Sequence, residues 1–190
     1  VGLYYSPPDW HFFKNYMTFH YGSGSPEFPD RAHYGPDFEV LSEIQKPSAE
    51  MMDTYYSYVN GQIKELMTRY GKVDLLWFDG SVPDVSRVMT IEEIRSYQPG
   101  IVVNHRLHGV GDFDTFECRM PDAQPNGPWE HCHIWFEDGG WAYMETAKGF
   151  RPAQWVYDTY QQCKAWEGNC LIDAGPTKEG TMPDYFYAGV

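Results

Sequence analysis

An apolar run that ends in an acid constrains the fold of this chain most strongly. In the stretch YGKVDLLWFDGS, residues 70–81, the run over 73–78 is followed at once by Asp79 and Gly80. A short apolar run ending in turn residues is typical of a buried strand in a parallel sheet. A carboxylate at that strand end either caps the next loop or takes part in chemistry, because α/β enzymes place reactive groups at the C-terminal ends of strands.

Strands and helices are predicted to alternate along the chain. We expect strands over 1–6, 73–78, 101–106 and 169–175, and a short fifth strand around 132–136. We expect helices over 48–71, 90–99 and 152–166 from the spacing of apolar residues, a capping box at Thr90 and Glu93, and a helix-starting Pro152. The segments 7–47 and 107–150 are rich in loop residues.

This alternation predicts an α/β fold with parallel strands joined by crossover helices. A doubly wound sheet is complete with five strands. A TIM-type (β/α)8 barrel needs eight strands and about 250 residues, so under that alternative this 190-residue chain lacks the first strands.

Composition narrows the classes of partner. The chain carries 14 basic and 27 acidic residues, a formal net charge of −13, which disfavours nucleic acid and anionic membrane surfaces. No apolar run is long enough to predict a membrane span. The chain starts inside its first predicted strand, so we expect a partial chain. The four cysteines have no C-x-x-C spacing, so free buried thiols are expected and a disulfide stays open.

A second acid follows the next predicted strand. That strand ends in NHR, residues 104–106, and GDFDTFE follows at 111–117. Glycoside cleavage needs two carboxyl groups, one that attacks or activates water and one that protonates the leaving oxygen. Aromatic residues make up 17% of the chain, which suits either a large core or a cleft that stacks on sugars. Acidic chains often carry such pairs by chance, so this spacing alone does not decide.

The order of several motifs carries a more specific signal. The motifs are GLYYSPPDW, YGKVDLLWFDG, VVNHR, GDFDTFE, PWEHC, GGWAY and CLIDAGPTKEGTMP. In this order they resemble the α-L-fucosidases of glycoside hydrolase family 29, and they cover nearly the whole chain. The resemblance implies a (β/α)8-like barrel and retention through a covalent fucosyl-enzyme. It also implies that residues 1–190 form one partial catalytic domain, the C-terminal half of the barrel, with no second domain visible.

The resemblance assigns catalytic roles to acidic residues. Asp79 matches the nucleophile, with a loop-capping Asp as the alternative. Glu117 matches the acid/base of several relatives, and Glu130 in PWEHC is its rival. Either Glu could instead anchor a loop.

The resemblance also assigns sugar contacts. Tyr4 matches a tyrosine near the sugar, Arg106 an arginine that reaches the sugar or the nucleophile, and Trp141 an aromatic residue against the apolar face of fucose. The alternatives are a core tyrosine, a structural salt bridge and a core aromatic. The chain departs from the family at Asp173, where Asn is usual, and at Ala142, where Gly is usual.

A metal site is not expected from the histidines of this chain. His131 and His133 would share one face of a strand, but no further ligand follows at a recognisable spacing. We therefore expect neither metal nor other cofactor.

The expected function is that of a retaining exo-α-L-fucosidase acting on fucosylated oligosaccharides or glycoconjugates. The alternatives are a glycosidase for another sugar and a non-catalytic fucose-binding relative. The resemblance places further pocket residues on early strands outside this chain, so the chain alone is not expected to hold a whole sugar pocket. Family habit implies a secreted, periplasmic or lysosomal protein, and the oligomeric state stays open.

Overall fold

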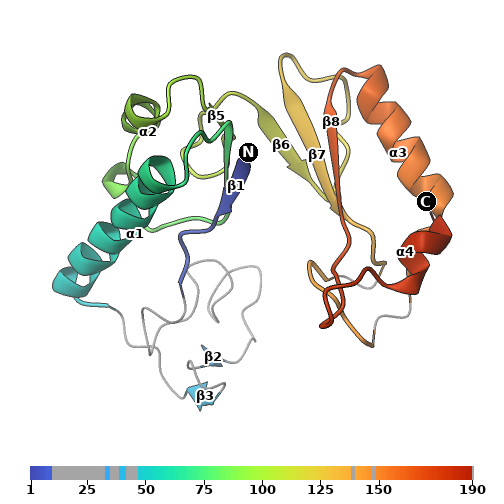
Figure 1. The fold of residues 1–190 in the computed structure, drawn as a ribbon, viewed down its shortest axis with the longest axis horizontal. Helices are drawn as coiled ribbons and strands as arrows, with labels where there is room; N and C mark the ends of the chain where they lie inside the picture. Colours follow the sequence, from blue (N-terminus) through green and yellow to red (C-terminus); the bar gives the residue numbers. More distant parts are fainter. Residues whose placement is uncertain (10–32, 35–38, 42–46, 138–139, 147–148, 190) are drawn as a thin grey trace. The chain divides into compact units, whose positions relative to one another are not determined.

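The computed structural model describes residues 1–9, 33–34, 39–41, 47–137, 140–146 and 149–189 (Figure 1). The chain divides into two compact units, Val1–Asp112 and Phe113–Val190. Among the described residues, no helix has the length and apolar character needed to cross a membrane.

The described part of the first unit contains a parallel sheet of three strands in the order β1-β4-β5. These strands are β1 (Gly2–Tyr5), β4 (Leu75–Phe78) and β5 (Val102–Val103). The predicted strands are confirmed, but β5 is much shorter than expected over 101–106. Its pairing with β4 stops at Val103 because the side chain of Asn104 takes over the next hydrogen bonds.

Two helices cover one face of this sheet, α1 (Ala49–Arg69) and α2 (Ile91–Tyr97), with a short 3₁₀ helix, η1 (Val85–Arg87), between β4 and α2. The sequence predicts a helix over 48–71, and in the structure Ser48 is the N-cap of α1, with its hydroxyl accepting from Met51 N–H. The capping box of α2 is complete, since Thr90 and Glu93 each accept the other's backbone N–H at 3.2 and 3.0 Å.

The pleat of the sheet separates two functions. In register, Tyr5 pairs with Phe78 and Tyr4 pairs with Trp77. Tyr5 and Phe78 join the core under α1 and α2, where burial of each large apolar side chain contributes roughly 1.5–3 kcal/mol. Because side chains alternate along a strand, Tyr4 and Trp77 lie on the opposite face, away from the helices.

The segment 7–47, predicted as a loop, lies largely outside the described residues. Its described part includes a short antiparallel pair, β2 (His33–Tyr34) and β3 (Val40–Leu41).

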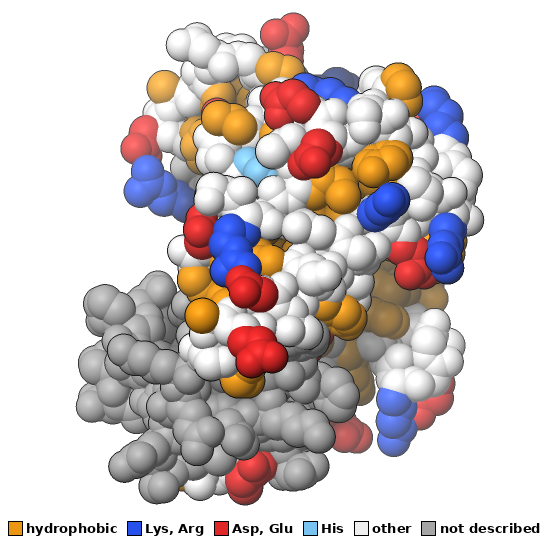
Figure 2. Space-filling view, turned by 90° about the vertical axis from the view of Figure 1, so that its left-hand side faces the viewer, with side chains coloured by type: hydrophobic (Ala, Val, Ile, Leu, Met, Phe, Trp, Pro, Cys, Tyr) orange, Lys and Arg blue, Asp and Glu red, His pale blue; other side chains and the backbone are white. Residues whose placement is uncertain are grey.

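Figure 2 shows acidic, basic and hydrophobic side chains interspersed on the visible face.

The described part of the second unit contains another three-stranded parallel sheet, in the order β6-β7-β8. Its strands are β6 (Asp114–Glu117), β7 (Trp129–Ile134) and β8 (Asn169–Asp173), and its helices are α3 (Ala153–Ala165) and α4 (Asp184–Gly189). The helix over 152–166 and the strand over 169–175 are confirmed. Neither β6 nor α4 was predicted, and β7 begins before the expected residue 132.

The polar residues of β6 and β7 prevented these strands from being recognised in the sequence. β6 reads DTFE with no buried residue, and β7 reads WEHCHI with every residue buried despite a glutamate and two histidines. Neither stretch is an apolar run or a clean alternation, which are the signals for strands. The α/β class is nevertheless confirmed by both sheets. The partial barrel stays a prediction, because two three-stranded sheets do not establish it.

All four cysteines are free, as expected. Cys132 and Cys163 are buried and Cys170 is half-buried, but Cys118 is exposed, so the expectation of burial is wrong for that residue. Cys118 follows the end of β6, where the chain leaves the sheet with a positive φ of 55°.

Candidate active site

Asp79 directly follows β4 and is held by donors on both carboxylate oxygens. Its Oδ1 accepts from Gly80 N–H at 2.8 Å and from Arg106 Nη2 at 2.7 Å. Its Oδ2 accepts from the Tyr4 hydroxyl at 2.5 Å. Its backbone N–H donates to Tyr5 O at 2.9 Å, which extends the β1–β4 pairing to this residue. A side chain fixed in this way has one orientation relative to the sheet.

The surroundings of Asp79 favour its charged form. Partial burial disfavours the carboxylate, but the hydrogen bond from Tyr4, the Arg106 guanidinium and Gly80 N–H together outweigh it and lower the pKa of Asp79. The side chains of Asp79 and Arg106 are 30% and 21% exposed, so solvent screens this ion pair only in part. The carboxylate is therefore ionised at neutral pH and accessible from solvent.

Tyr4 is a surface residue of the sheet and not a core tyrosine. It is 62% exposed, and its ring stacks on Trp77 with centroids 5.6 Å apart and planes at 16°. Partial burial of the hydroxyl, the hydrogen bond to Asp79 and that residue's charge raise the pKa of Tyr4. The hydroxyl therefore stays protonated and remains a donor.

Trp77 completes what we call the Asp79 cluster, defined as Tyr4, Trp77, Asp79 and Arg106. The Arg106 guanidinium carbon lies 5.0 Å from the centroid of the Trp77 ring, a cation–π contact on the same ring that Tyr4 stacks against. Trp77 was not among the site residues expected from the sequence. Its position two residues before Asp79, on the same face of a strand, was the available signal.

Asn104 is a second residue that the sequence analysis missed. It is fully buried; its Oδ1 accepts from Phe78 N–H at 2.9 Å and its Nδ2 donates to Phe78 O at 2.9 Å. The side chain thus replaces one residue of β5 and pairs the backbone directly before Asp79. An asparagine directly after the apolar run 101–103 is the signal that could have found it.

Among the acids of the second unit, Glu117 lies at the C-terminal end of a strand. It is the last residue of β6 and is exposed, whereas the sequence analysis expected it in a loop. Glu130, the rival, is the second residue of β7 and is 6% exposed. Its Oε2 accepts from Asn169 Nδ2 at 2.6 Å. The register pairs Glu117 with Cys132, so Glu130 lies two residues nearer the N-terminal end of the same sheet.

Trp141 is 45% exposed, so it is not a core aromatic. Its loop packs against the chain that leaves β8. A Cβ added to Gly175 would lie 2.1 Å from Tyr143 N and 2.6 Å from the carbonyl carbon of Ala142. Only a glycine permits this approach, which fixes the Trp141 loop beside the C-terminal end of β8.

The histidine pair of β7 faces a helix. His131 and His133 are 2% and 8% exposed, with ring centroids 5.5 Å apart, and His133 lies 4.9 Å from the ring of Trp155 in α3. Burial lowers the pKa of both rings and keeps them neutral. In the part of the chain that the structure describes, no group of three or more His, Cys, Asp or Glu is placed to hold a metal.

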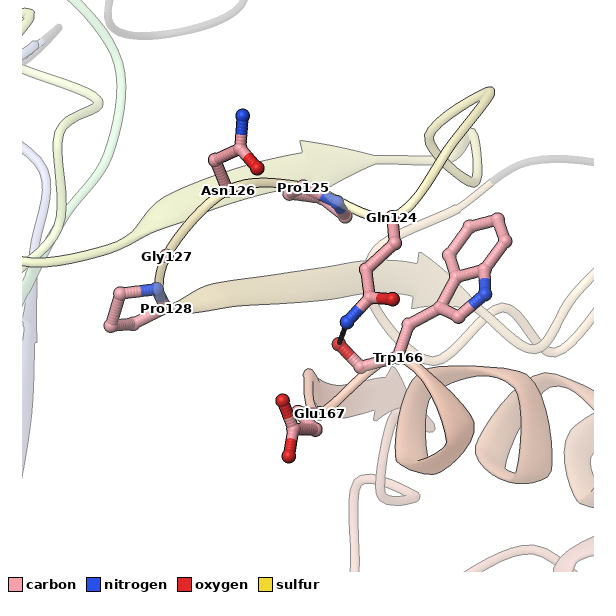
Figure 3. A pocket seen from close by; sticks show the side chains of 7 residues that line it. All are labelled: Gln124, Pro125, Asn126, Gly127, Pro128, Trp166 and Glu167. Carbon is pink, nitrogen blue, oxygen red and sulfur yellow. Dashed lines mark hydrogen bonds between the residues drawn. The ribbon is translucent and has the colours of Figure 1, made fainter.

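An open hollow of about 590 Å³ lies away from these residues (Figure 3). It is lined by residues 124–128, before β7, and by Trp166 and Glu167, after α3. Gln124 Nε2 donates to Trp166 O at 3.5 Å across it. It lies at the N-terminal end of β7, the opposite end of the sheet from Glu117, and none of the candidate residues lines it.

Comparison with known proteins identifies the family. A sequence model described as α-L-fucosidase matches residues 1–189. The chain belongs to the α-L-fucosidase family. A comparison with curated protein sequences gave no match.

Solved structures of α-L-fucosidases share the fold. α-L-fucosidase isoenzyme 1 from Paenibacillus thiaminolyticus superposes with a TM-score of 0.72 at 25% identity, covering 98% of this chain and 45% of that one. α-L-fucosidase AlfC from Lactobacillus casei, in complex with α-L-fucose product, gives a TM-score of 0.67 at 23% identity and covers 99% and 57%. An AlfC variant in complex with Fuca(1,6)GlcNAc superposes with a TM-score of 0.69 at 23% identity. The match covers 99% of this chain and 57% of that one. This chain thus spans about half the length of these fucosidases.

Proposed function

We propose that the protein to which this chain belongs is a retaining exo-α-L-fucosidase, which removes terminal α-L-fucose from fucosylated glycans. The observation that carries the proposal is Asp79, a solvent-accessible and ionised carboxylate at the C-terminal end of a parallel strand, in a chain of the α-L-fucosidase family. We further propose that both sheets belong to one (β/α)8-like barrel, of which residues 1–190 supply the C-terminal half as a single partial domain.

In the first step, Asp79 attacks the anomeric carbon of fucose while the bond from that carbon to the leaving oxygen breaks. Oδ1 has two donors, Gly80 N–H and Arg106, whereas Oδ2 has only the Tyr4 hydroxyl among the described residues. The oxygen with fewer donors retains more electron density, so we assign the attack to Oδ2. Glu117 gives its proton to the departing oxygen, which leaves as an alcohol.

In the second step, Glu117, now a carboxylate, takes a proton from water. The resulting hydroxide equivalent attacks the anomeric carbon, the ester bond breaks, and Asp79 is released as a carboxylate. This route requires the two carboxyl groups to lie about 5–5.5 Å apart across the sugar.

Strand position supports Glu117 over Glu130 as the acid/base. In α/β barrels the chemistry lies at the C-terminal ends of strands. Glu117 ends β6 and is exposed, whereas Glu130 lies near the start of β7, buried against Asn169. We assign Glu130 the role of a structural anchor between β7 and β8.

Two exposed aromatic surfaces support a sugar ligand. Trp141 and Tyr4, which are 45% and 62% exposed, offer ring faces beside strand ends, and Tyr4 stacks on the buried Trp77. The AlfC structures named above contain α-L-fucose and Fuca(1,6)GlcNAc, and we propose fucose as the sugar for this protein as well.

The test is hydrolysis of an aryl α-L-fucoside by the complete protein and its Asp79→Ala variant. Loss of a nucleophile lowers kcat by about 10³-fold or more. Azide should restore turnover in the variant and yield fucosyl azide, because it takes the place of the missing carboxylate. Asp74→Ala is the matched control, since Asp74 lies before the same strand and pairs with Lys72 at the surface. Near-normal turnover by Asp79→Ala would contradict the assignment, and fucose binding without turnover by the wild type would identify a binding relative.

A further inference from the structure

Asp173 shares an edge and a face of the second sheet with Glu117. It is the last residue of β8, as Glu117 is the last residue of β6. The register pairs Glu117 with Cys132 and Cys132 with Leu171, two residues before Asp173. Residues in register or two apart lie on one face, so both acids lie on the face opposite α3. Neighbouring strands are about 4.8 Å apart and successive strand residues rise about 3.3 Å, so the Cα atoms of Glu117 and Asp173 lie roughly 12 Å apart, with both side chains on the same face.

The carboxyl group of Asp173 is incompletely satisfied. Its Oδ2 is buried and has no hydrogen-bond partner within the described residues. The backbone of Asp173 is paired, since its carbonyl oxygen accepts from Trp135 N–H at 3.0 Å. An unsatisfied buried oxygen costs stability, and each such exception in a native protein requires an explanation, of which a functional role is one. The fold therefore holds the backbone of this residue firmly and leaves one oxygen of its side chain without a partner among the described residues.

The Trp141 loop adds an independent observation at the same place. Gly175, two residues after Asp173, lies against the backbone of Ala142 and Tyr143. Trp141 directly precedes these residues and is 45% exposed. An exposed aromatic ring and an unsatisfied carboxyl group thus flank the C-terminal end of β8. Sugar sites combine these two elements, a ring for the apolar face and hydrogen-bonding groups for the hydroxyls.

We propose that Asp173 is a further substrate-contacting residue, which hydrogen-bonds a hydroxyl group of the sugar held between the Trp141 loop and Glu117. This inference rests on the proposed function. The bond joins a carboxyl group to an alcohol, and no covalent step is involved.

Asp173 can make this contact in either protonation state. Burial raises the pKa of its carboxyl group. The carboxylate accepts from a sugar hydroxyl, and the protonated carboxyl also donates to one. The titratable groups on the same face are Glu117, Glu130 and Cys132, and Tyr143 lies in the adjoining loop.

The experiment compares Asp173→Asn and Asp173→Leu in the complete protein. The two side chains have similar size, but only Asn can donate and accept. We expect Asp173→Leu to raise KM for an aryl α-L-fucoside and the Kd for L-fucose by about tenfold to a hundredfold, with a smaller change in kcat. Asp173→Asn should retain most of the affinity. Asp158→Asn, an exposed change on α3, is the control.

Thermal unfolding separates binding from structure. Because Oδ2 has no partner to lose, neither variant should lower Tm, and a loss of affinity at unchanged Tm supports the contact. Unchanged KM and Kd in both variants of a fucosidase that turns over normally would overturn the role of Asp173 alone. A wild-type protein that neither hydrolyses fucosides nor binds fucose would overturn the proposed function and this role with it.

Discussion

Asp79 and Asp173 occupy equivalent places in their own sheets, and their surroundings treat them in opposite ways. Each comes at the C-terminal end of a parallel strand, and each is half-buried. Asp79 has donors on both oxygens and a lowered pKa, whereas Asp173 has an unsatisfied Oδ2 and a raised pKa. Burial acts in the same direction on both, so the donors decide. The fold therefore determines where each carboxyl group lies, and the neighbouring donors determine whether its pKa is lowered or raised.

The largest expected effect separates the two candidate acid/base residues. Glu117→Gln should lower kcat by about 10²–10⁴-fold for substrates with poor leaving groups, because a general acid is lost. Glu130→Gln, the matched variant, should keep turnover, since an amide can still accept from Asn169. Steady-state kinetics on aryl fucosides with leaving groups of graded pKa measures both. A reversed ranking would transfer the acid/base role to Glu130 and break the link between strand end and chemistry.

The next effect tests how firmly the Asp79 end of its sheet is held. Asn104→Ala should lower the free energy of unfolding by about 2–4 kcal/mol, because it strands both the N–H and the C=O of Phe78 in a buried site. Denaturant titration measures the change, and kcat should fall with it as Asp79 loses its fixed support. Asn126→Ala, at an exposed loop residue, should change stability by less than about 0.5 kcal/mol. Equal stability of the two variants would show that the two hydrogen bonds between Asn104 and the Phe78 backbone are dispensable.

A smaller effect tests what keeps Asp79 charged. Tyr4→Phe removes the donor to Oδ2, so the pKa of Asp79 should rise. Under the proposed mechanism Asp79 must be ionised to attack, and the acid limb of the kcat/KM profile should therefore move to higher pH. On the neutral plateau the loss should stay below about tenfold, the value of one ordinary hydrogen bond. An unmoved acid limb would mean that Arg106 and Gly80 suffice.

The smallest expected effect concerns stability against pH and has opposite signs at the two acids. The raised pKa of Asp173 means that its ionisation costs stability, so the wild type loses stability as pH rises through the folded-state pKa. Asp173→Asn should remove this loss and slightly raise Tm at neutral pH. The lowered pKa of Asp79 contributes stability above its unfolded-state pKa, and this is lost as pH falls. Paired melting curves of Asp79→Asn and Asp173→Asn across pH would contradict the comparison if both shifted alike.

The sequence predicted the elements of this chain where one physical signal dominated. The apolar run before Asp79, the helical spacing of α1 and the capping box of α2 each have a local cause, and each is found in the structure. β6 and β7 have no such local signal, because their strand state depends on neighbours that bury or pair polar side chains. The motifs placed Asp79, Tyr4 and Arg106, which the structure brings together.

Other features of the site depend on contacts that no local pattern encodes. The role of Trp77 depends on Tyr4 and Arg106, which come from other parts of the chain. The hydrogen bonds between the Asn104 side chain and the Phe78 backbone form only because β5 lies beside β4. The sequence shows an aspartate at position 173 where the resemblance leads us to expect asparagine. The unsatisfied oxygen of that aspartate can be recognised only in the folded sheet.

The close approach at Gly175 limits how this protein can be redesigned. The backbone of residues 142–143 occupies the space where any side chain at position 175 would begin. Loops carrying different aromatic residues could replace the Trp141 segment in a search for new sugar specificities. Each such graft must keep glycine at position 175, because any larger residue would clash with the grafted loop. In a library that randomises position 175, most variants would therefore fail to fold correctly before their specificity could be tested.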